Sequence, residues 1–571
     1  MTKIRAAMTL FAAALTGVVL CACGSGAPRA SSSTTGSPSS QSSSPSSHAA
    51  SISADPATGP VAPITSPGGP FLYDRYGRVV LMHGVDLVYK IPPYEIEVSG
   101  TGKNVLTTAE VKKMASLGFD VVRLGIIWKG LEPGTDPIDD PSICTSGKPG
   151  SSGAGQFDAA TYDAYIKRLD ATIAMLAKYG IYSLLDMHQD VYSDVFAGEG
   201  APDWAVCTDG LKPKPRYNLA DWADNLQGPG VVQAYENFWE NDVVGNLQGA
   251  FDALWTRIAE HYKDNPWVIG YDPFNEPYGA NILSDGAAFD AQLQCFYMGR
   301  ANPGLDQAGK PISCPADDPS LGLIPRLEAA DPNHLVFYEP NFTVDSGPPN
   351  HIGPMSEPRL VLNFHDYCFL HVPNGPEPPD YGKICSPLEN LVFNERDKER
   401  VRDSTAEQPG GPAWFLTEFG ATTDTADLGR ITADADAHLV GWMYWQWLLY
   451  DDPTGSHTSG LWPSSAPTAA MLNVLSQTYG QAIAGTPTSM SFDTSTSHFT
   501  LQYVADHKIT EPTVIFVPLS EHYQHGYCAT VTGAHVTSKP GSEHLDVVND
   551  PGATTVRVTV VPGSCPAGSA T

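Results

Sequence analysis

The stretch WVIGYDPFNEPYG, residues 267–279, decides how the rest of the chain is interpreted. Its first half is an apolar run of the kind that forms a buried strand. Asn275, Glu276 and Pro277 follow that run directly. In an α/β barrel, polar side chains at the carboxyl ends of the strands form the active site. The stretch therefore predicts a barrel strand that ends at a catalytic rim, and a partner for Glu276 must come from elsewhere.

Seven further apolar runs of strand length occur between residues 79 and 447, and amphipathic segments separate several of them. One predicted helix, 106–118, has the capping box Thr107 and Glu110 at its start. Strands that alternate with helices in this way predict an α/β fold, specifically a (β/α)8 TIM barrel. The eight predicted strands are 79–86, 119–126, 181–188, 267–274, 334–340, 360–367, 413–419 and 440–447.

The pattern changes after residue 482. HFTLQYV (498–504) and TVRVTVV (555–561) alternate apolar and polar residues, which is typical of half-buried strands. We therefore expect a barrel over 64–482, followed by a small antiparallel β-sandwich over 483–571.

The first 23 residues predict an export signal. Lys3 and Arg5 precede a short apolar run, and Leu20 and Ala22 occupy positions −3 and −1 relative to Cys23. This arrangement predicts a bacterial lipoprotein cleavage site, although Cys21 fits position −2 poorly. Cleavage by an ordinary signal peptidase is the alternative.

Residues 24–63 are rich in Ser, Pro, Thr and Gly, and such a composition cannot bury enough apolar surface to fold. We expect a disordered tether that holds the barrel away from a membrane, with a lipid on Cys23 as the contact to the membrane surface. The predicted location is therefore outside the cytoplasm, as a secreted or cell-envelope lipoprotein of a bacterium.

Charge and cysteine content limit the functions of the chain. The formal net charge is −30, and nucleic-acid binding needs a basic surface, so nucleic acid is not an expected partner. Eight cysteines follow Cys23 and allow 105 connectivities. We expect neighbours to pair, because export favours disulfides; no zinc-type CxxC spacing remains among them. The expected pairs are Cys144–Cys207, Cys295–Cys314, Cys368–Cys385 and Cys528–Cys565.

The partner expected for Glu276 is Glu418 in AWFLTEFGA, because these residues end the fourth and seventh predicted strands. Two carboxyl groups about 5 Å apart across a barrel mouth suit retaining glycoside hydrolysis, in which one acts as acid and base and the other as nucleophile. Asn275 could bind the sugar 2-hydroxyl. This chemistry needs no cofactor and no metal, and for that reason we do not interpret His188, Asp190 and Glu199 as metal ligands.

Arg123, Asn275–Glu276 and Glu418, in this order on the second, fourth and seventh strands, resemble glycoside hydrolase family 5. The resemblance covers roughly 65–480 and implies that Glu276 is the acid/base and Glu418 the nucleophile. HGVDLVYKIPPY (83–94), DMHQDVYS (186–193) and GEGAPDWA (198–205) are similar to the endoglycoceramidases and glycosylceramidases of that family. The small C-terminal β-domain fits the same group.

The resemblance also implies a set of residues that bind substrate. His188 and Asp190 would hold a sugar hydroxyl, His365 and Tyr367 would lie beside the nucleophile, and Trp445 would lie under the sugar. The remaining expected binding residues are Arg123, Asn275 and Lys90. Asp86 departs from the pattern, because Asn is expected after Gly-Val on the first strand.

Alternatives stay open at this point. Arg123, His188, His365, Tyr367 and Trp445 could be structural core residues, and Lys90 could be a solvated surface charge. The resemblance favours hydrolysis between glycan and ceramide in glycosphingolipids. A family 5 endoglucanase or mannanase, a glucosylceramidase, and a non-enzymatic carbohydrate-binding surface lipoprotein are the other candidates.

Overall fold

A computed structural model describes most of the chain from residue 57 onward. The described ranges are 57–134, 157–211, 225–240, 247–279, 286–299, 314, 322–368, 381–451, 459–463 and 466–565. The predicted export signal, Cys23, Cys144 and all of the tether before residue 57 lie outside them.

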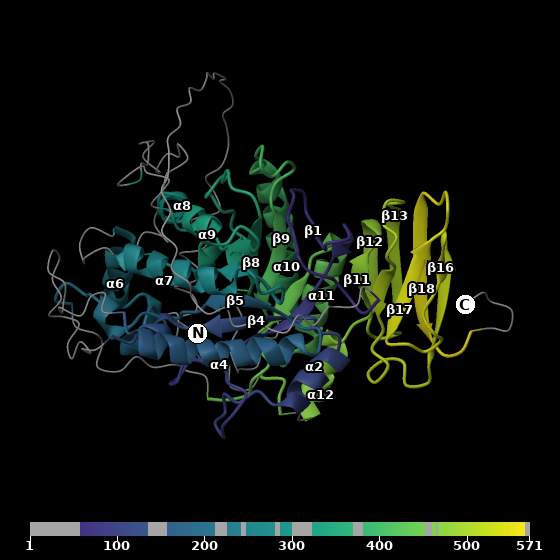
Figure 1. Cartoon of the computed structure of the whole chain (residues 1–571), viewed down its shortest axis with the longest axis horizontal. Helices are drawn as coiled ribbons and strands as arrows, with labels where there is room; N and C mark the ends of the chain where they lie inside the picture. Colours follow the sequence, from purple (N-terminus) through teal and green to yellow (C-terminus); the bar gives the residue numbers. More distant parts are fainter. Residues whose placement is uncertain are drawn as a thin grey trace, which may run out of the picture. The chain divides into compact units, whose positions relative to one another are not determined.

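Eight parallel strands close into a barrel, which confirms the predicted TIM-barrel fold (Figure 1). Both faces of these strands are buried, as expected for a parallel sheet covered by helices. The strands are β3 His83–Leu87, β4 Val121–Ile126, β5 Tyr182–Met187, β6 Val268–Asp272, β7 Leu335–Tyr338, β8 Leu360–Asp366, β9 Ala413–Phe419 and β10 Trp442–Tyr444.

Amphipathic helices bury their apolar faces in the same core as the barrel strands. The predicted capping box is present: the Thr107 hydroxyl accepts from the Glu110 N–H, and the Glu110 carboxylate accepts from the Thr107 N–H at 2.8 Å. The α-helices are α2 Thr108–Ser116, α3 Trp128–Leu131, α4 Ala159–Ala177, α6 Pro229–Glu240, α7 Leu247–Tyr262, α8 Gly286–Met298, α9 Leu323–Ala330, α10 Tyr381–Arg402, α11 Thr425–His438 and α12 Ala466–Leu475. None of the described helices is both long and apolar enough to span a membrane.

The C-terminal region forms two antiparallel sheets around a second apolar core, as the alternating pattern predicts. The four-stranded sheet has the order β12 Gly485–Asp493, β13 His498–Ala505, β18 Thr555–Pro562 and β15 Tyr527–Thr532. The six-stranded sheet has the order β1 Leu72–Tyr73, β2 Val79–Val80, β11 Tyr479–Ile483, β14 Thr513–Phe516, β17 His544–Asn549 and β16 Ala534–Val536.

The predicted first barrel strand, 79–86, is wrong in its first part. Val79 and Val80 form β2 and pair with β11 of the C-terminal sheet, and the barrel strand begins only at His83. Val79 and Leu81 belong to the second core, whereas Val80 belongs to the barrel core. The apolar run is continuous, so it carries no signal that the chain leaves one sheet and enters another.

Polar and aromatic contacts join the barrel to the C-terminal sheets. The His83 ring stacks between Tyr479, at 3.7 Å between centroids, and Trp442, at 4.3 Å. The Gln481 amide donates to the buried Asp120 carboxylate at 3.2 Å. These contacts tie β3, β10 and the residue before β4 to β11 of the C-terminal sheets.

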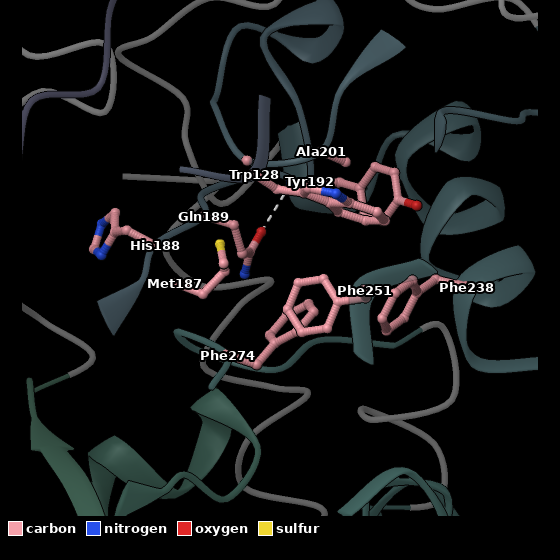
Figure 2. Close-up of a pocket in the computed structure, with 10 residues that line it drawn as sticks. Trp128, Met187, His188, Gln189, Tyr192, Ala201, Phe238, Phe251 and Phe274 are labelled. Atoms are coloured by element: carbon pink, nitrogen blue, oxygen red, sulfur yellow. Dashed lines mark hydrogen bonds between the residues drawn. The ribbon is translucent and has the colours of Figure 1, made fainter. Parts of the chain in front are cut away.

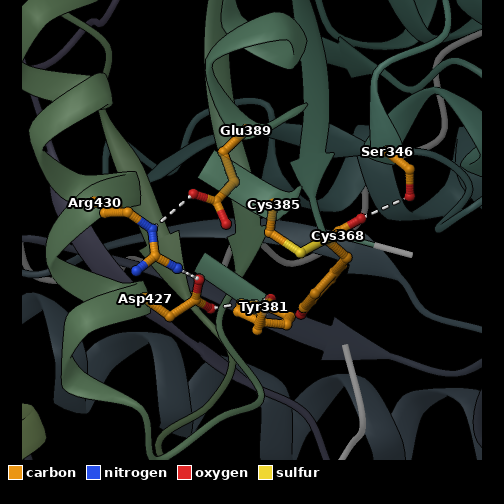
Figure 3. Close-up of a disulfide and its surroundings, with 8 residues drawn as sticks. Ser346, Cys368, Tyr381, Cys385, Glu389, Asp427 and Arg430 are labelled. Carbon is orange, nitrogen blue, oxygen red and sulfur yellow. Dashed lines mark hydrogen bonds and ion pairs between the residues drawn. A yellow bond between two sulfur atoms is a disulfide. The ribbon is translucent and has the colours of Figure 1, made fainter. Parts of the chain in front are cut away.

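Three of the expected disulfides are confirmed: Cys295–Cys314, Cys368–Cys385 and Cys528–Cys565. Cys207 is also disulfide-bonded, and its expected partner Cys144 lies outside the described ranges. Figure 3 shows the Cys368–Cys385 bridge, which joins the end of β8 to α10. Beside it, Arg430 of α11 links Glu389 at 3.1 Å to Asp427 at 2.6 Å.

Asp436 of α11 accepts the Phe492 N–H of β12 at 3.0 Å, and burial raises the pKa of its carboxyl to about 7. An unfolded aspartate has a pKa of about 3.9. Between these values the folded chain holds a proton that the unfolded chain releases, so this group lowers the free energy of unfolding as pH rises from about 4 to about 7.

Asp436→Asn should remove this loss, because the amide oxygen can still accept the Phe492 N–H. The difference in the free energy of unfolding, variant minus unaltered chain, should be larger at pH 8 than at pH 5 by roughly 1 kcal/mol or more. Denaturant unfolding at both pH values measures it, with the exposed Asp163→Asn as control. An identical difference at the two pH values would contradict the prediction.

Candidate active site

The barrel brings Glu276 and Glu418 together at the carboxyl ends of its strands. Glu276 follows β6, Glu418 lies near the end of β9, and His365 of β8 lies between them. One side-chain atom from each of the three lies within 4.8 Å of the others. Two carboxyl groups therefore face each other across a short gap.

Glu418 is held by two hydrogen-bond donors. Nη1 of Arg123 donates to Oε2 at 2.9 Å, and the Tyr367 hydroxyl donates to Oε1 at 2.9 Å. Donors on both oxygens, one of them charged, stabilise a carboxylate and fix its orientation. Its side chain is 8% exposed, so the protein does not enclose it completely.

Glu276 has different surroundings. Its φ angle is +42°, a left-handed conformation that is uncommon for a side chain of this size and that occurs often at functional sites. Nδ1 of His365 lies 3.0 Å from its Oε1. Burial, reinforced by the negative charge of Asp190, raises the pKa of Glu276 to about 7. The Glu276 carboxyl can therefore keep its proton up to about pH 7. Glu418, in contrast, is bound by the Arg123 guanidinium.

Arg123 of β4 is completely buried beneath this pair and binds several side chains. It donates to Asp272 at 2.9 Å, to Asp186 at 3.0 Å and to Asn275 at 2.7 Å, besides Glu418. Burial alone would lower the pKa of the guanidinium, but the surrounding carboxylates, led by Asp186, raise it well above its usual range. Arg123 is thus a fixed positive charge.

Asn275 is buried and engaged on both sides of its amide. Oδ1 accepts from Arg123, and Nδ2 donates to the Gln189 carbonyl at 3.0 Å. An amide nitrogen carries two hydrogens, so one is left beyond that contact for another acceptor. Gln189 in turn donates to the backbone carbonyls of Asn275 and Glu276, and its position was not singled out in the sequence.

Lys90, His188, Asp190 and Trp445 form one group beside Glu276. The Lys90 ammonium binds the Asp190 carboxylate and lies 4.2 Å from the centre of the Trp445 ring. The His188 ring stacks on the same tryptophan, with centroids 5.1 Å apart. The sequence left open whether these residues were core packing or a surface charge. They lie together next to the carboxyl pair.

The charges in this group are mutually compensated. Burial lowers the pKa of His188, but Asp186, bound to its Nδ1 at 2.8 Å, outweighs this and raises it to about 9. Lys90 holds the pKa of Asp190 well below its usual range against the effect of burial. His188, Asp190 and Glu199 are close enough to surround a metal ion. The Lys90 ammonium, 3.8 Å from Glu199, already supplies positive charge there.

Asp86 of β3 is buried 3.6 Å from Nη1 of Arg123. Neither side-chain oxygen has a hydrogen-bond partner among the residues that the structure describes. Burial raises the pKa of this carboxyl well above its usual range, despite the opposing effect of Arg123. A neutral carboxylic acid therefore stands where the resemblance leads one to expect an asparagine.

An apolar pocket lies next to this site, beyond the end of β5 (Figure 2). Met187 and the rings of Trp128, Phe238, Phe251 and Phe274 line it. The His188 ring points away from these aromatic side chains in Figure 2 and stacks on Trp445 instead. The pocket is therefore part of the aromatic packing behind the site.

The chain matches known sequences and structures over most of its length. Residues 89–450 match the profile described as cellulase (glycosyl hydrolase family 5), and residues 477–560 match the glycoside hydrolase family 5 C-terminal domain. Endoglycoceramidase I of Rhodococcus hoagii (strain 103S) is 30% identical over 521 residues, which is 87% of this chain and 88% of that protein. An endoglycoceramidase of Hydra vulgaris is 28% identical over 532 residues, 86% of this chain and 88% of its own.

The structure of endo-glycoceramidase II from Rhodococcus sp. in its ganglioside GM3 complex is similar, with a TM-score of 0.64 and 24% identity. The match covers 87% of this chain and all of the other. It supports the architecture of a barrel joined to antiparallel sheets.

The barrel and these similarities define the protein as a glycosidase, and not as a binding protein without activity. The chain belongs to glycoside hydrolase family 5, because the family profile spans more than half of its length.

Replacing Lys90 tests the compensation of charges beside Glu276. Lys90→Met keeps most of the side-chain volume but removes the closer of the two cations beside the buried Asp190, the other being His188 at 3.5 Å, so the free energy of unfolding should fall by about 3 kcal/mol. Lys103→Met is the matched control, because Lys103 is 61% exposed and meets the exposed Asp451 at 3.5 Å. It should cost under about 1 kcal/mol.

Denaturant unfolding of both lysine variants measures this difference. Equal losses would show that the Lys90–Asp190 pair contributes no more than a surface pair.

Proposed function

We propose that the chain is a retaining glycosidase that cleaves the β-glycosidic bond between the glycan and the ceramide of glycosphingolipids. The observation that carries the proposal is the pair Glu276 and Glu418, which lie close together in opposite electrostatic surroundings. A retaining enzyme needs carboxyl groups about 5 Å apart, whereas an inverting enzyme needs a wider gap for water. Approach of the two groups to within 4.8 Å supports the retaining mechanism.

In the first step, Glu276 gives its proton to the glycosidic oxygen while Glu418 attacks the anomeric carbon. The bond from that carbon to the ceramide oxygen breaks, ceramide leaves with the proton, and a glycosyl–enzyme ester forms on Glu418. The raised pKa of Glu276 suits the acid, and the two hydrogen bonds on Glu418 hold the nucleophile in place.

In the second step, Glu276 is a carboxylate and accepts a proton from water, which attacks the anomeric carbon of the ester. The released glycan keeps the β configuration. The Glu418 carboxylate is regenerated next to Arg123, whose fixed charge stabilises it. Each glutamate thus returns to its starting protonation state.

The remaining residues suit a sugar bound beside the two glutamates. Lys90, His188 and Asp190 place charged hydrogen-bonding groups beside Glu276, and Trp445, whose buried ring packs against Lys90 and His188, holds them in position. The free hydrogen of the Asn275 amide could reach the sugar 2-hydroxyl, a contact that strengthens in the transition state. We assign Tyr367 and His365 to orienting the two glutamates.

The lipid part of the proposal is supported by the relatives named endoglycoceramidase and by the ganglioside complex of the similar structure. Glucosylceramide, and the glucan or mannan substrates of other family 5 enzymes, are the alternative substrates.

We also propose that the chain is exported and attached to a membrane by a lipid on Cys23. The basic residues, the apolar run and the small residues before Cys23 support this. Attachment through the 24–63 tether would place the barrel near amphiphilic substrates.

The two glutamate roles can be separated by the leaving group. Glu276→Gln should lower kcat/KM about 10²-fold or more on an alkyl β-glycoside, whose leaving group needs a proton, and much less on a 2,4-dinitrophenyl β-glycoside. Glu418→Gln should abolish turnover of both, because no nucleophile remains. Exposed Glu407→Gln is the control. A near-normal rate of Glu276→Gln on the alkyl glycoside, or of Glu418→Gln on either glycoside, would refute the assignment of that residue.

Substrate class is tested with residues 57–571 incubated in parallel with a ganglioside bearing a fluorescent ceramide, glucosylceramide and carboxymethylcellulose. We expect intact oligosaccharide and ceramide from the ganglioside, and none from Glu418→Gln. Hydrolysis of glucosylceramide alone would make the protein a glucosylceramidase. Hydrolysis of the polymer alone would refute the lipid assignment and keep the two glutamates.

A further inference from the structure

Glu339, directly after β7, is a buried carboxyl to which the proposed mechanism gives no role. Its side chain is 1% exposed, and neither oxygen has a hydrogen-bond partner within the described part of the chain. A buried carboxyl without hydrogen bonds is costly, and more so when it is charged. Such a group calls for an explanation in terms of its neighbours.

The nearest complementary atom belongs to His365. Oε1 of Glu339 lies 3.5 Å from Nε2 of His365, which also lacks a hydrogen-bond partner among the described residues. On the other side of the same ring, Nδ1 lies 3.0 Å from Oε1 of Glu276. The imidazole therefore stands between Glu339 and the proposed acid.

The charges around Glu339 favour its protonated form. Burial raises its pKa well above the usual range, and Asp272, Asp345 and Glu276 add to the rise. Arg123, 3.9 Å away, opposes it but binds four other carboxyl groups more closely.

His365 is neutral, because burial lowers its pKa to about 3 against the opposing effect of Glu418. A neutral imidazole has one N–H, so only one of its two ring nitrogens can donate.

We propose that Glu339, as a neutral carboxylic acid, is a positioning residue that fixes the tautomer of His365: its O–H donates to Nε2, so that Nδ1 carries the hydrogen and donates to Oε1 of Glu276. This rests on the proposed role of Glu276 as the acid. Because Oε1 then accepts a hydrogen bond, the catalytic proton of Glu276 is placed on Oε2.

The opposite protonation of Glu339 would have the opposite effect. An ionised Glu339 would attract an N–H to Nε2, which leaves Nδ1 as an acceptor. Nδ1 would then draw the proton of Glu276 toward the ring and away from the leaving group. Glu418 competes weakly for the same nitrogen, since its Oε2 lies 3.9 Å away and is already bound by Arg123 at 2.9 Å.

Two replacements distinguish positioning from packing. Glu339→Met keeps the volume but cannot donate, whereas Glu339→Gln can still donate through its amide. We expect Met to lower kcat/KM about tenfold or more on octyl β-lactoside and less than about twofold on 2,4-dinitrophenyl β-lactoside, because only the first needs acid catalysis. Gln should recover most of the loss. The control is Asp252→Asn, a buried carboxyl on α7.

Equal losses on the two substrates, no loss with Met, or a Gln variant as poor as Met would each overturn the proposal. A second measurement does not depend on activity. In the ¹⁵N-histidine NMR spectrum, His365, assigned by its absence from His365→Gln, should show a neutral ring protonated at Nδ1 from pH 5 to pH 8. Protonation at Nε2 would overturn the proposal. An unaltered chain that cleaves neither lactoside would refute the proposed function while the spectrum still reports the tautomer.

Discussion

The buried guanidinium of Arg123 is the interaction on which the site depends. Five carboxyl groups approach it within 4 Å, and each comes from a different strand or strand end. One positive charge cannot balance five negative ones in a medium of low polarity, so some of these acids must stay protonated. The barrel therefore sets a pattern of charged and neutral acids, and the difference between Glu276 and Glu418 is one part of that pattern.

This pattern gives the neighbouring polar residues a common role. Asp186 holds His188 as a cation, Lys90 keeps Asp190 ionised, and Tyr367 and Arg123 fix Glu418. Each group stabilises a charge state of its neighbour, and unequal surroundings of this kind let two glutamates of one protein differ in protonation. A change of charge at one of these positions is therefore expected to shift the pKa values of several others.

Much of the fold could be predicted from the sequence, because buried parallel strands and amphipathic helices leave strong periodic patterns. The glutamate pair could be predicted as well, since both residues end apolar runs. The sequence did not reveal that Asp86, Asp272, Glu339 and Asp345 belong to one network of buried, interacting carboxyl groups. Acids within or beside apolar runs look alike in a sequence, and only closure of the barrel shows which ones meet. The prediction that the barrel strand begins at residue 79 was wrong for a related reason. A continuous apolar run does not show that its two parts pack into different cores.

The membership of β1 and β2 in the C-terminal sheet affects how the chain folds during synthesis and whether its C-terminal region can be transferred to another protein. The six-stranded sheet contains residues from both ends of the described chain, so during synthesis its first two strands must wait for hundreds of residues before their partner β11 exists. For the same reason, the C-terminal region is not a self-contained module. A gene fusion that transferred only the segment after the barrel would lack two strands of its sheet, while the barrel left behind would carry β1 and β2 without their partner β11.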